Sequence, residues 1–377
     1  MKILFATGGT GGHINPALAV AGKIREQYGD EAEILFVGTP THMEAQLVPA
    51  AGYDFKTVDV RGFYRAPTWN NFKRDAVAVV KMFTSSVEST KIIKEFAPDV
   101  AIGFGGYVSG PVIRKAHKLG VPTAIHEQNA YPGITNKALA KQVDIVMLTS
   151  EDAAPRMECK NEPKITGLPV RNEMIAADRK ACREKMGIAD NEIVILSMGG
   201  SLGADAINNA MVDLIAELKD EPNLRFIHAM GQYGLYVPEK LKEKGVDPEQ
   251  MKNLDLREYI HDMDVCMPAA DIIICRSGAS SLYEIRALGK ASILIPSPNV
   301  AENHQYHNAM ELVNNDAALI IEEKDLTGEA MTAMVKGLIA DPERIKTIGQ
   351  NAKNMAILNA TDLIVENLLS LVKKDED

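Results

Sequence analysis

Two glycine-rich turns, one in each half of the chain, carry the residues best suited to chemistry. The first runs from Gly8 to His13 after a short apolar run, and the second runs from Gly199 to Ala204 after another. A helical pattern follows each turn. A helix that starts at such a turn points unpaired N–H groups and a partial positive charge at one place, so each turn predicts a phosphate or diphosphate site. The repeated context is stronger than a single glycine motif.

His13 ends the first turn, at the predicted mouth of a ligand site. Histidine ionises near neutral pH and predicts a general base there, although a histidine that only closes the turn would give the same pattern. The segment Gly103–Gly110 follows another strand-like run and resembles a second anion cradle in the same half. His126, Glu127 and Asn129 gather at a further strand end, where polar groups need either a ligand or structural hydrogen bonds.

The second half carries two more polar positions at predicted strand ends. Glu284 lies one turn into a helix that follows Cys275, where a carboxylate can accept hydrogen bonds from ribose hydroxyls or balance the helix dipole. Gln305 can both donate to and accept from a sugar. Asp262 and Asp264 form a D-x-D pair, but Asp262 resembles a helix N-cap. With no His/Cys cluster at metal-ligand spacing and no P-loop lysine, we expect neither a metal cofactor nor ATP hydrolysis.

Composition sets bounds on the class of protein. The chain has 377 residues, 46% of them hydrophobic, and a formal net charge of −10. The acidic balance argues against general nucleic-acid binding. The four cysteines show no C-x-x-C spacing, which fits a reducing cytoplasm. Because no apolar run approaches the roughly 20 residues that span a bilayer, we expect a soluble or peripheral protein.

Strand-like and helix-like segments alternate along both halves. The strands are apolar throughout, which is typical of parallel strands covered on both faces. Predicted strands are Ile3–Ala6, Ile34–Val37, Phe55–Val60, Val100–Gly103, Thr123–His126, Ile145–Leu148, Ile193–Met198, Arg225–Met230, Asp271–Ile274, Ala291–Ile295 and Ala318–Ile321. Predicted helices of the first half are 16–28, 43–51, 72–96, 111–119 and 134–141. The predicted fold class is α/β, with two Rossmann-like domains and a cleft between them.

Glycine and proline interrupt the pattern near Ile165–Val170 and mark the predicted domain boundary. The first domain is expected to cover residues 1–166 and the second residues 167–350. Residues 351–377 are expected to form a helical tail that packs back on the first domain.

The ordered set of these motifs resembles the MurG family of glycosyltransferases over essentially the whole chain. The segments that carry the resemblance are Gly8–His13 with Pro16, Gly105–Pro111, His126–Asn129 with Thr135–Lys137, Gly199–Ala204, Tyr259–Met263, Cys275–Glu284 and Asn303–Gln305. The resemblance implies a GT-B fold, with a nucleotide donor in the second domain and a lipid-diphosphate acceptor in the first.

The resemblance also implies an activity and its partners. It implies inverting transfer of GlcNAc from UDP-GlcNAc to the 4-hydroxyl of undecaprenyl-diphospho-MurNAc-pentapeptide, which converts lipid I to lipid II. This is a step of peptidoglycan synthesis, and hence of cell-wall biogenesis, cell shape and division. The enzyme would lie on the cytoplasmic face of the bacterial membrane as a peripheral protein, close to an anionic surface and to other cell-wall synthesis proteins.

Roles for individual residues follow from the same resemblance. His13 is the expected base, and Glu127 is the reserve candidate. The UDP-GlcNAc site would be formed by Thr10, Gly11, Gly12, Asn129, Arg171, Ser201, Ile260, Ala279, Ser280, Ser281, Leu282, Tyr283, Glu284 and Gln305. The acceptor diphosphate would contact Gly9, Gly105, Gly106, Tyr107 and Ser109. Within the donor site, backbone at Ile260 would read the uracil edge, and Arg171 and Ser201 would hold the diphosphate.

Three positions depart from the family pattern. Leu168 replaces an asparagine, Leu202 replaces a glutamine, and Ser281 replaces a threonine while keeping a hydroxyl group. The first two substitutions remove hydrogen bonds at the edge of the site. They leave its central assignments in place.

The segment 69–83 is the predicted membrane-docking element. On a helix, apolar side chains fall on one stripe with cations at its edges, as binding to anionic lipid requires, although such a stripe can equally belong to a core. The docking residues proposed are Phe72, Lys73, Arg74, Val80 and Phe83.

The residues alone also allow other functions. One alternative is another GT-B enzyme that uses a UDP-sugar, such as a glycerolipid glycosyltransferase or a UDP-GlcNAc epimerase. A dinucleotide-dependent oxidoreductase is a second alternative, but Gly38-Thr39 follow Val37 where an acidic residue would contact the NAD ribose. An idle nucleotide-binding module is a third.

Overall fold

The computed structural model describes residues 1–60 and 84–372, which divide into two compact units. The first unit is formed by residues 1–169 together with 357–377, and the second by residues 170–356. The predicted boundary at 166 lies three residues before this division. The predicted boundary at 350 falls inside helix α14 (Pro342–Asn354), because that helix packs on the second unit through Ile348 and Ala352.

The first unit is built on a seven-stranded parallel sheet of order β3-β2-β1-β4-β5-β6-β7. Its strands are β1 (Lys2–Ala6), β2 (Glu33–Gly38), β3 (Asp54–Thr57), β4 (Val100–Gly103), β5 (Thr123–Glu127), β6 (Ile145–Leu148) and β7 (Lys164–Ile165). The direction of winding reverses between β1 and β4. In sheets of this kind ligands bind beyond the carboxyl ends of the strands at the reversal, which is where Gly8–His13 and Gly103–Gly110 begin.

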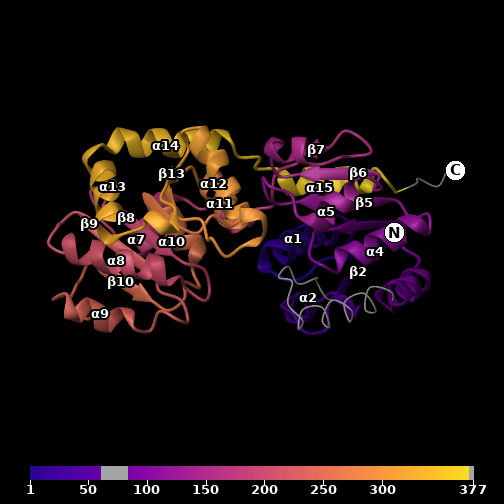
Figure 1. Ribbon diagram of the computed structural model, residues 1–377, viewed down its shortest axis with the longest axis horizontal. Helices are drawn as coiled ribbons and strands as arrows, with labels where there is room; N and C mark the ends of the chain where they lie inside the picture. The colour runs from indigo at the N-terminus through magenta and orange to yellow at the C-terminus, as the bar shows by residue number, and fades with distance from the viewer. Residues whose placement is uncertain (61–83, 373–377) are drawn as a thin grey trace. The chain divides into compact units, whose positions relative to one another are not determined.

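Helices cover both faces of this sheet. They are α1 (Gly11–Tyr28), α2 (Glu44–Ala50), α4 (Ser109–Lys118), α5 (Ile134–Ala140) and α15 (Ala360–Leu369). Figure 1 shows α15, in yellow, among the N-terminal elements of this unit. Ile364, Val365 and Leu368 of α15 join the cluster that contains the buried face of α1, and Lys23 pairs with Asp362 at 3.4 Å.

The second unit repeats the architecture with a six-stranded parallel sheet of order β10-β9-β8-β11-β12-β13. Its strands are β8 (Ile193–Met198), β9 (Leu224–Ala229), β10 (Leu254–Arg257), β11 (Ile272–Cys275), β12 (Ala291–Leu294) and β13 (Leu319–Ile320). Its helices are α6 (Asn172–Ile175), α7 (Arg179–Lys185), α8 (Asp205–Glu217), α9 (Val237–Glu243), α10 (Met263–Ala269), α11 (Ala279–Leu288), α12 (His304–Asn314), α13 (Gly328–Ala340) and α14. Winding reverses between β8 and β11.

The predicted α/β fold class with two Rossmann-like domains is confirmed. The central strands agree with their apolar runs, whereas β7 and β10 were not predicted. Strand β10 alternates leucine with Asp255 and Arg257 at the edge of its sheet, so it lacks an apolar run. Helix α1 begins at Gly11, five residues before its predicted start, because two glycines of low helix propensity precede the apolar pattern. Within residues 1–60 and 84–372, no helix is long and apolar enough to cross a membrane.

Candidate functional site

The turn after β1 places a helix N-terminus at the reversal point of the first sheet. Thr10 is the N-cap of α1, and its side chain makes no capping hydrogen bond. Gly9 and Thr10 are exposed, and His13 lies partly exposed on the first turn. The first turn of this 18-residue helix is therefore not satisfied by a side-chain cap, which is the arrangement that suits an anion.

The turn after β4 packs directly against this first turn. A Cβ at Gly106 would lie 2.3 Å from the carbonyl oxygen of Gly8, and the φ of Gly106 is +80°. A Cβ at Gly105 would lie 2.9 Å from the ring of His13. Both glycines are needed here because the two turns touch backbone to backbone and the His13 ring occupies the space that a Cβ at position 105 would take.

Of the residues predicted to bind the acceptor diphosphate, Tyr107 and Ser109 differ sharply in exposure. Tyr107 is 63% exposed. Ser109 is fully buried, and its hydroxyl lies 2.8 Å from the Ala6 carbonyl oxygen and 2.7 Å from that of Gly105. It also accepts the Gly105 N–H at 3.1 Å. Ser109 thus shapes the turn, and its hydroxyl has no surface to offer a ligand.

Glu44 is a functional-site neighbour that the sequence analysis missed. Its carboxylate is buried and accepts the N–H of Gly9 at 3.0 Å, the N–H of Thr39 at 3.0 Å and the Thr39 hydroxyl at 2.5 Å. Burial by itself raises the pKa of this carboxyl, but the hydrogen bonds from Thr39 and Gly9 outweigh it and lower the pKa. In sequence, an acidic residue that begins a short helix indicates only dipole compensation.

Glu127, the reserve candidate for the base, is bonded within its own loop. One carboxylate oxygen accepts the backbone and side-chain N–H groups of Asn129 at 2.9 and 3.1 Å. The other accepts the N–H of Gly133 at 3.1 Å and the side-chain amide of Asn136 at 2.8 Å. Glu127 is 1% exposed, so this geometry favours the structural role over proton transfer.

The two histidines of the first unit are linked through Gln128, to which the sequence analysis assigned no role. The side-chain oxygen of Gln128 lies 2.9 Å from Nδ1 of His13, and its nitrogen lies 3.2 Å from Nδ1 of His126. His126 is fully buried, and burial lowers its pKa to about 4. Only the H-E-Q-N spacing at a strand end could have indicated this connection.

The glycine turn of the second unit is held by a partner turn after β9. A Cβ at Gly203 would lie 2.3 Å from the Met230 carbonyl oxygen, and one at Gly231 would lie 2.1 Å from the Gly203 nitrogen. Backbone hydrogen bonds join the two turns, including Tyr233 N–H to the Leu202 carbonyl oxygen at 3.0 Å. Ser201 is exposed at the tip, where the prediction requires it to be accessible.

Helix α11 begins at the reversal point of the second sheet. Its N-cap, Gly278, has no side chain, and Ser280 and Ser281 on its first turn are partly exposed. Glu284 lies further along and forms an ion pair with Arg171 at 3.4 Å. Burial raises the pKa of Glu284, and Arg171 opposes that shift. The structure therefore brings together two residues that the prediction assigned to ribose and diphosphate.

Three further donor-site predictions fall on buried positions, and Gln305 is partly buried. Leu282, Tyr283 and Ile260 are 2%, 2% and 4% exposed, which leaves mainly their backbone for a ligand. The side-chain oxygen of Gln305 accepts the N–H groups of Ser277 and Ser297 at 3.3 and 2.9 Å, so its amide N–H₂ is the part left for a sugar.

The predicted D-x-D segment does not gather metal ligands. Asp262 is the N-cap residue of α10, but its side chain makes no capping bond and pairs with Arg257 at 2.5 Å instead. Over the described ranges 1–60 and 84–372, no three His, Cys, Asp or Glu side chains group so as to hold a metal ion.

The predicted docking residues Phe72, Lys73, Arg74, Val80 and Phe83 lie outside the described residues.

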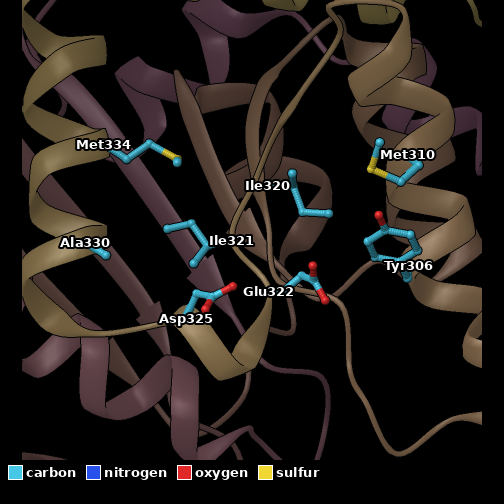
Figure 2. A pocket seen from close by; sticks show the side chains of 8 residues that line it. All are labelled: Tyr306, Met310, Ile320, Ile321, Glu322, Asp325, Ala330 and Met334. Atoms are coloured by element: carbon cyan, nitrogen blue, oxygen red, sulfur yellow. The ribbon is translucent and has the colours of Figure 1, made fainter.

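A cavity of about 360 Å³ lies elsewhere in the second unit, between α12, the end of β13 and α13. Figure 2 shows its lining: Tyr306, Met310, Ile320, Ile321, Glu322, Asp325, Ala330 and Met334. None of these was predicted as a site residue. The cavity has a mixed lining that includes Glu322 and Asp325, and it coincides with neither a glycine turn nor one of the polar strand ends singled out from the sequence.

Comparison with known families matches both units. The glycosyltransferase family 28 N-terminal domain matches residues 3–148, and the family 28 C-terminal domain matches residues 194–366. The chain is 40% identical to a UDP-N-acetylglucosamine--N-acetylmuramyl-(pentapeptide) pyrophosphoryl-undecaprenol N-acetylglucosamine transferase of Acetivibrio thermocellus, over 99% of each chain. A protein of that name from Clostridioides difficile is 40% identical over 98% of this chain and 89% of the relative.

Solved structures of other proteins have the same fold as this chain. The crystal structure of Acinetobacter baumannii MurG superposes with a TM-score of 0.81 at 29% identity, covering 98% of this chain and 99% of the other. A UDP-GlcNAc 2-epimerase from Neisseria meningitidis gives a TM-score of 0.66 at 16% identity, covering 98% and 100% of the two chains, and shares the fold alone.

Proposed function

The chain belongs to glycosyltransferase family 28 and is an N-acetylglucosamine transferase, and from that premise we propose how its residues divide the reaction. The enzyme transfers GlcNAc from UDP-GlcNAc to undecaprenyl-diphospho-MurNAc-pentapeptide in peptidoglycan synthesis. The first unit binds the lipid-diphosphate acceptor, and the second binds the nucleotide donor.

One repeated observation supports this division. In each unit a helix begins without a side-chain cap at the point where the winding order of the strands reverses. A polar residue that we assign to the reaction lies on the first turns of that helix. His13 has this place on α1, and Glu284 has it on α11. A diphosphate at each helix N-terminus would satisfy the free N–H groups.

The proposed chemistry is direct displacement at the anomeric carbon. His13 accepts the proton of the muramoyl 4-hydroxyl, the oxygen forms a bond to the anomeric carbon, and the bond from that carbon to the diphosphate oxygen breaks. Attack from the face opposite the diphosphate inverts the configuration. UDP departs with the bonding pair, and its charge is held by Arg171 and the N-terminus of α11, which is why we propose that no metal ion is required.

The remaining residues bind and orient the two substrates. Glu284 accepts hydrogen bonds from ribose hydroxyls, the amide of Gln305 donates to a GlcNAc hydroxyl, and backbone at Ile260 reads uracil. The N-terminus of α1 holds the acceptor diphosphate, because the N–H groups of Gly9 and Gly105 are already donated to Glu44 and Ser109.

We further propose that the enzyme works as a peripheral protein at the anionic cytoplasmic face of the membrane. The sequence pattern of 69–83 supports this, because apolar and cationic side chains share one predicted helix. Replacing Phe72 and Lys73 by glutamate should weaken binding to anionic vesicles and leave UDP affinity unchanged. Unaltered vesicle binding would place the docking surface elsewhere.

The decisive experiment follows radiolabelled GlcNAc from UDP-GlcNAc into a short-chain lipid I analogue, with and without a chelator. We expect label in the lipid, equal rates in both conditions, and a loss of kcat of roughly 10²–10⁴-fold in His13→Ala with UDP binding retained. Near-normal turnover of His13→Ala would refute the base assignment. A chelator-sensitive rate would refute the metal-free mechanism.

A further inference from the structure

His126 has a defined proton position. Its Nε2 lies 2.9 Å from the carbonyl oxygen of Gly167, which can only accept, so Nε2 carries a hydrogen. The ring is fully buried and packs against Phe104 at a tilt of 31°, with ring centroids 5.5 Å apart. Burial lowers the His126 pKa to about 4, so the ring is neutral at physiological pH and its Nδ1 must be an acceptor.

The proton on His126 determines how the Gln128 amide is oriented. The Gln128 side-chain nitrogen faces two acceptors, Nδ1 of His126 at 3.2 Å and the His126 carbonyl oxygen at 3.0 Å. Only the N–H₂ end of an amide can face two acceptors, so the oxygen must point the other way. Gln128 is 2% exposed, and its surroundings leave this orientation as the one that satisfies both ends.

The oxygen of Gln128 in turn faces His13. It lies 2.9 Å from Nδ1 of that ring. An amide oxygen only accepts, so Nδ1 of His13 must donate and therefore carries the hydrogen. In the neutral ring the lone pair is then on Nε2. Gly105, whose missing Cβ would lie 2.9 Å from the His13 ring, lets the ring hold this position.

We propose that Gln128, oriented by His126, is a positioning residue that selects the His13 tautomer with its lone pair on Nε2. This inference rests on the proposed role of His13 as the base, because only the unprotonated nitrogen can take the proton of the acceptor hydroxyl. A histidine held in the other tautomer would present an N–H at Nε2 and could not act.

The other titratable groups on the loops around His13 do not fix its tautomer. His126 is neutral, and Glu127 is bonded to Asn129, Gly133 and Asn136. Glu44 is bonded to Gly9 and Thr39 on the opposite turn. Tyr107 is largely exposed. Among the residues that the structure describes, the contact of the Gln128 oxygen with Nδ1 therefore decides which ring nitrogen of His13 holds the proton.

Nitrogen-15 NMR of histidine-labelled enzyme tests the tautomer without any turnover. In the wild type with a neutral His13 ring, we expect Nδ1 protonated and Nε2 unprotonated. Gln128→Met, which keeps the shape and removes both polar atoms, should give a mixture of tautomers. Gln142→Met, at a partly buried position elsewhere in the same unit, is the matched control and should leave the His13 signals unchanged.

Kinetics on the same variants gives the second readout. Gln128→Met should lower kcat about 10–100-fold, as losing the partner of a functional histidine does in metal sites, with the KM for UDP-GlcNAc within about twofold. Thermal denaturation checks that each variant folds.

Two outcomes overturn the proposal. One is a wild-type His13 that carries its hydrogen on Nε2, and the other is a folded Gln128→Met enzyme with unchanged tautomer signals, whatever its kcat. If His13→Ala keeps near-normal turnover, the base role itself fails, and the NMR result still decides the tautomer assignment separately.

Discussion

Glu44 and Glu284 are two buried or largely buried carboxylates, one beside the first glycine turn of the first unit and the other on α11 of the second, and their surroundings differ. Glu44 accepts three hydrogen bonds from its own unit, and they lower its pKa. Glu284 has one ion pair, to an Arg171 side chain that is 52% exposed, and burial raises its pKa.

The difference in hydrogen bonding separates Glu44, a structural carboxylate, from Glu284, whose carboxylate can still accept hydrogen bonds from a ligand. Internal donors already compensate the desolvation of Glu44, so it stabilises the turn and has little left to offer a substrate. Glu284 is desolvated without such compensation, and ligand hydroxyls would supply the missing hydrogen bonds.

Removing the Glu44 carboxylate should have the largest effect. Glu44→Ala leaves the N–H groups of Gly9 and Thr39 and a hydroxyl without their buried acceptor, which should reduce the free energy of unfolding by about 3 kcal/mol. Urea denaturation measures this. A loss below about 1 kcal/mol would mean that the turn does not depend on Glu44.

Glu284→Ala should change binding instead of stability. The loss of charge-assisted hydrogen bonds to ribose, each worth roughly 1.5–3 kcal/mol, should raise the KM for UDP-GlcNAc at least tenfold. Steady-state kinetics measures the KM, and the melting temperature should stay within a few degrees. Glu217→Ala, which breaks an exposed pair with Lys336, is the control and should leave the KM unchanged. An unchanged KM in Glu284→Ala would assign Glu284 to the framework as well.

The raised pKa of Glu284 predicts opposite pH trends for binding and stability. UDP affinity should fall as the pH drops through that pKa, because protonation removes an acceptor that ribose needs. The free energy of unfolding should decrease slightly as the pH rises through the same window, because the folded state disfavours the charged form. Calorimetric titration and denaturation across pH 4–7 measure both trends. Both should vanish in Glu284→Gln, and their persistence would point to another group.

Leu202→Gln should have the smallest effect. Leu202 is 50% exposed at the tip of the second glycine turn, so stability should not change. The restored amide adds one hydrogen-bonding group near the donor and should lower the KM for UDP-GlcNAc by about two- to fivefold, the value of one neutral hydrogen bond. An unaltered KM would show that the substitution at this position is neutral.

The sequence predicted the strand-turn-helix units well because glycine turns after apolar runs are local signals. The structure places Glu284 and Arg171 3.4 Å apart, and the roles of these two residues and of His13 stay predictions. The sequence analysis missed Glu44 and Gln128 because their roles come from partners distant in sequence: Gly9 is 35 residues from Glu44, and His13 is 115 residues from Gln128. It also placed Ser109 on the ligand, whereas the fold buries that hydroxyl under its own turn.

Helix α15 has a consequence for how the protein is made. The first unit takes this helix from beyond residue 356, so its chain is interrupted by the whole second unit. On the ribosome, the apolar face of α1 that receives Ile364 and Leu368 must wait uncovered until the second unit has been synthesised. The second unit, which is continuous in sequence, can therefore complete its core before the first.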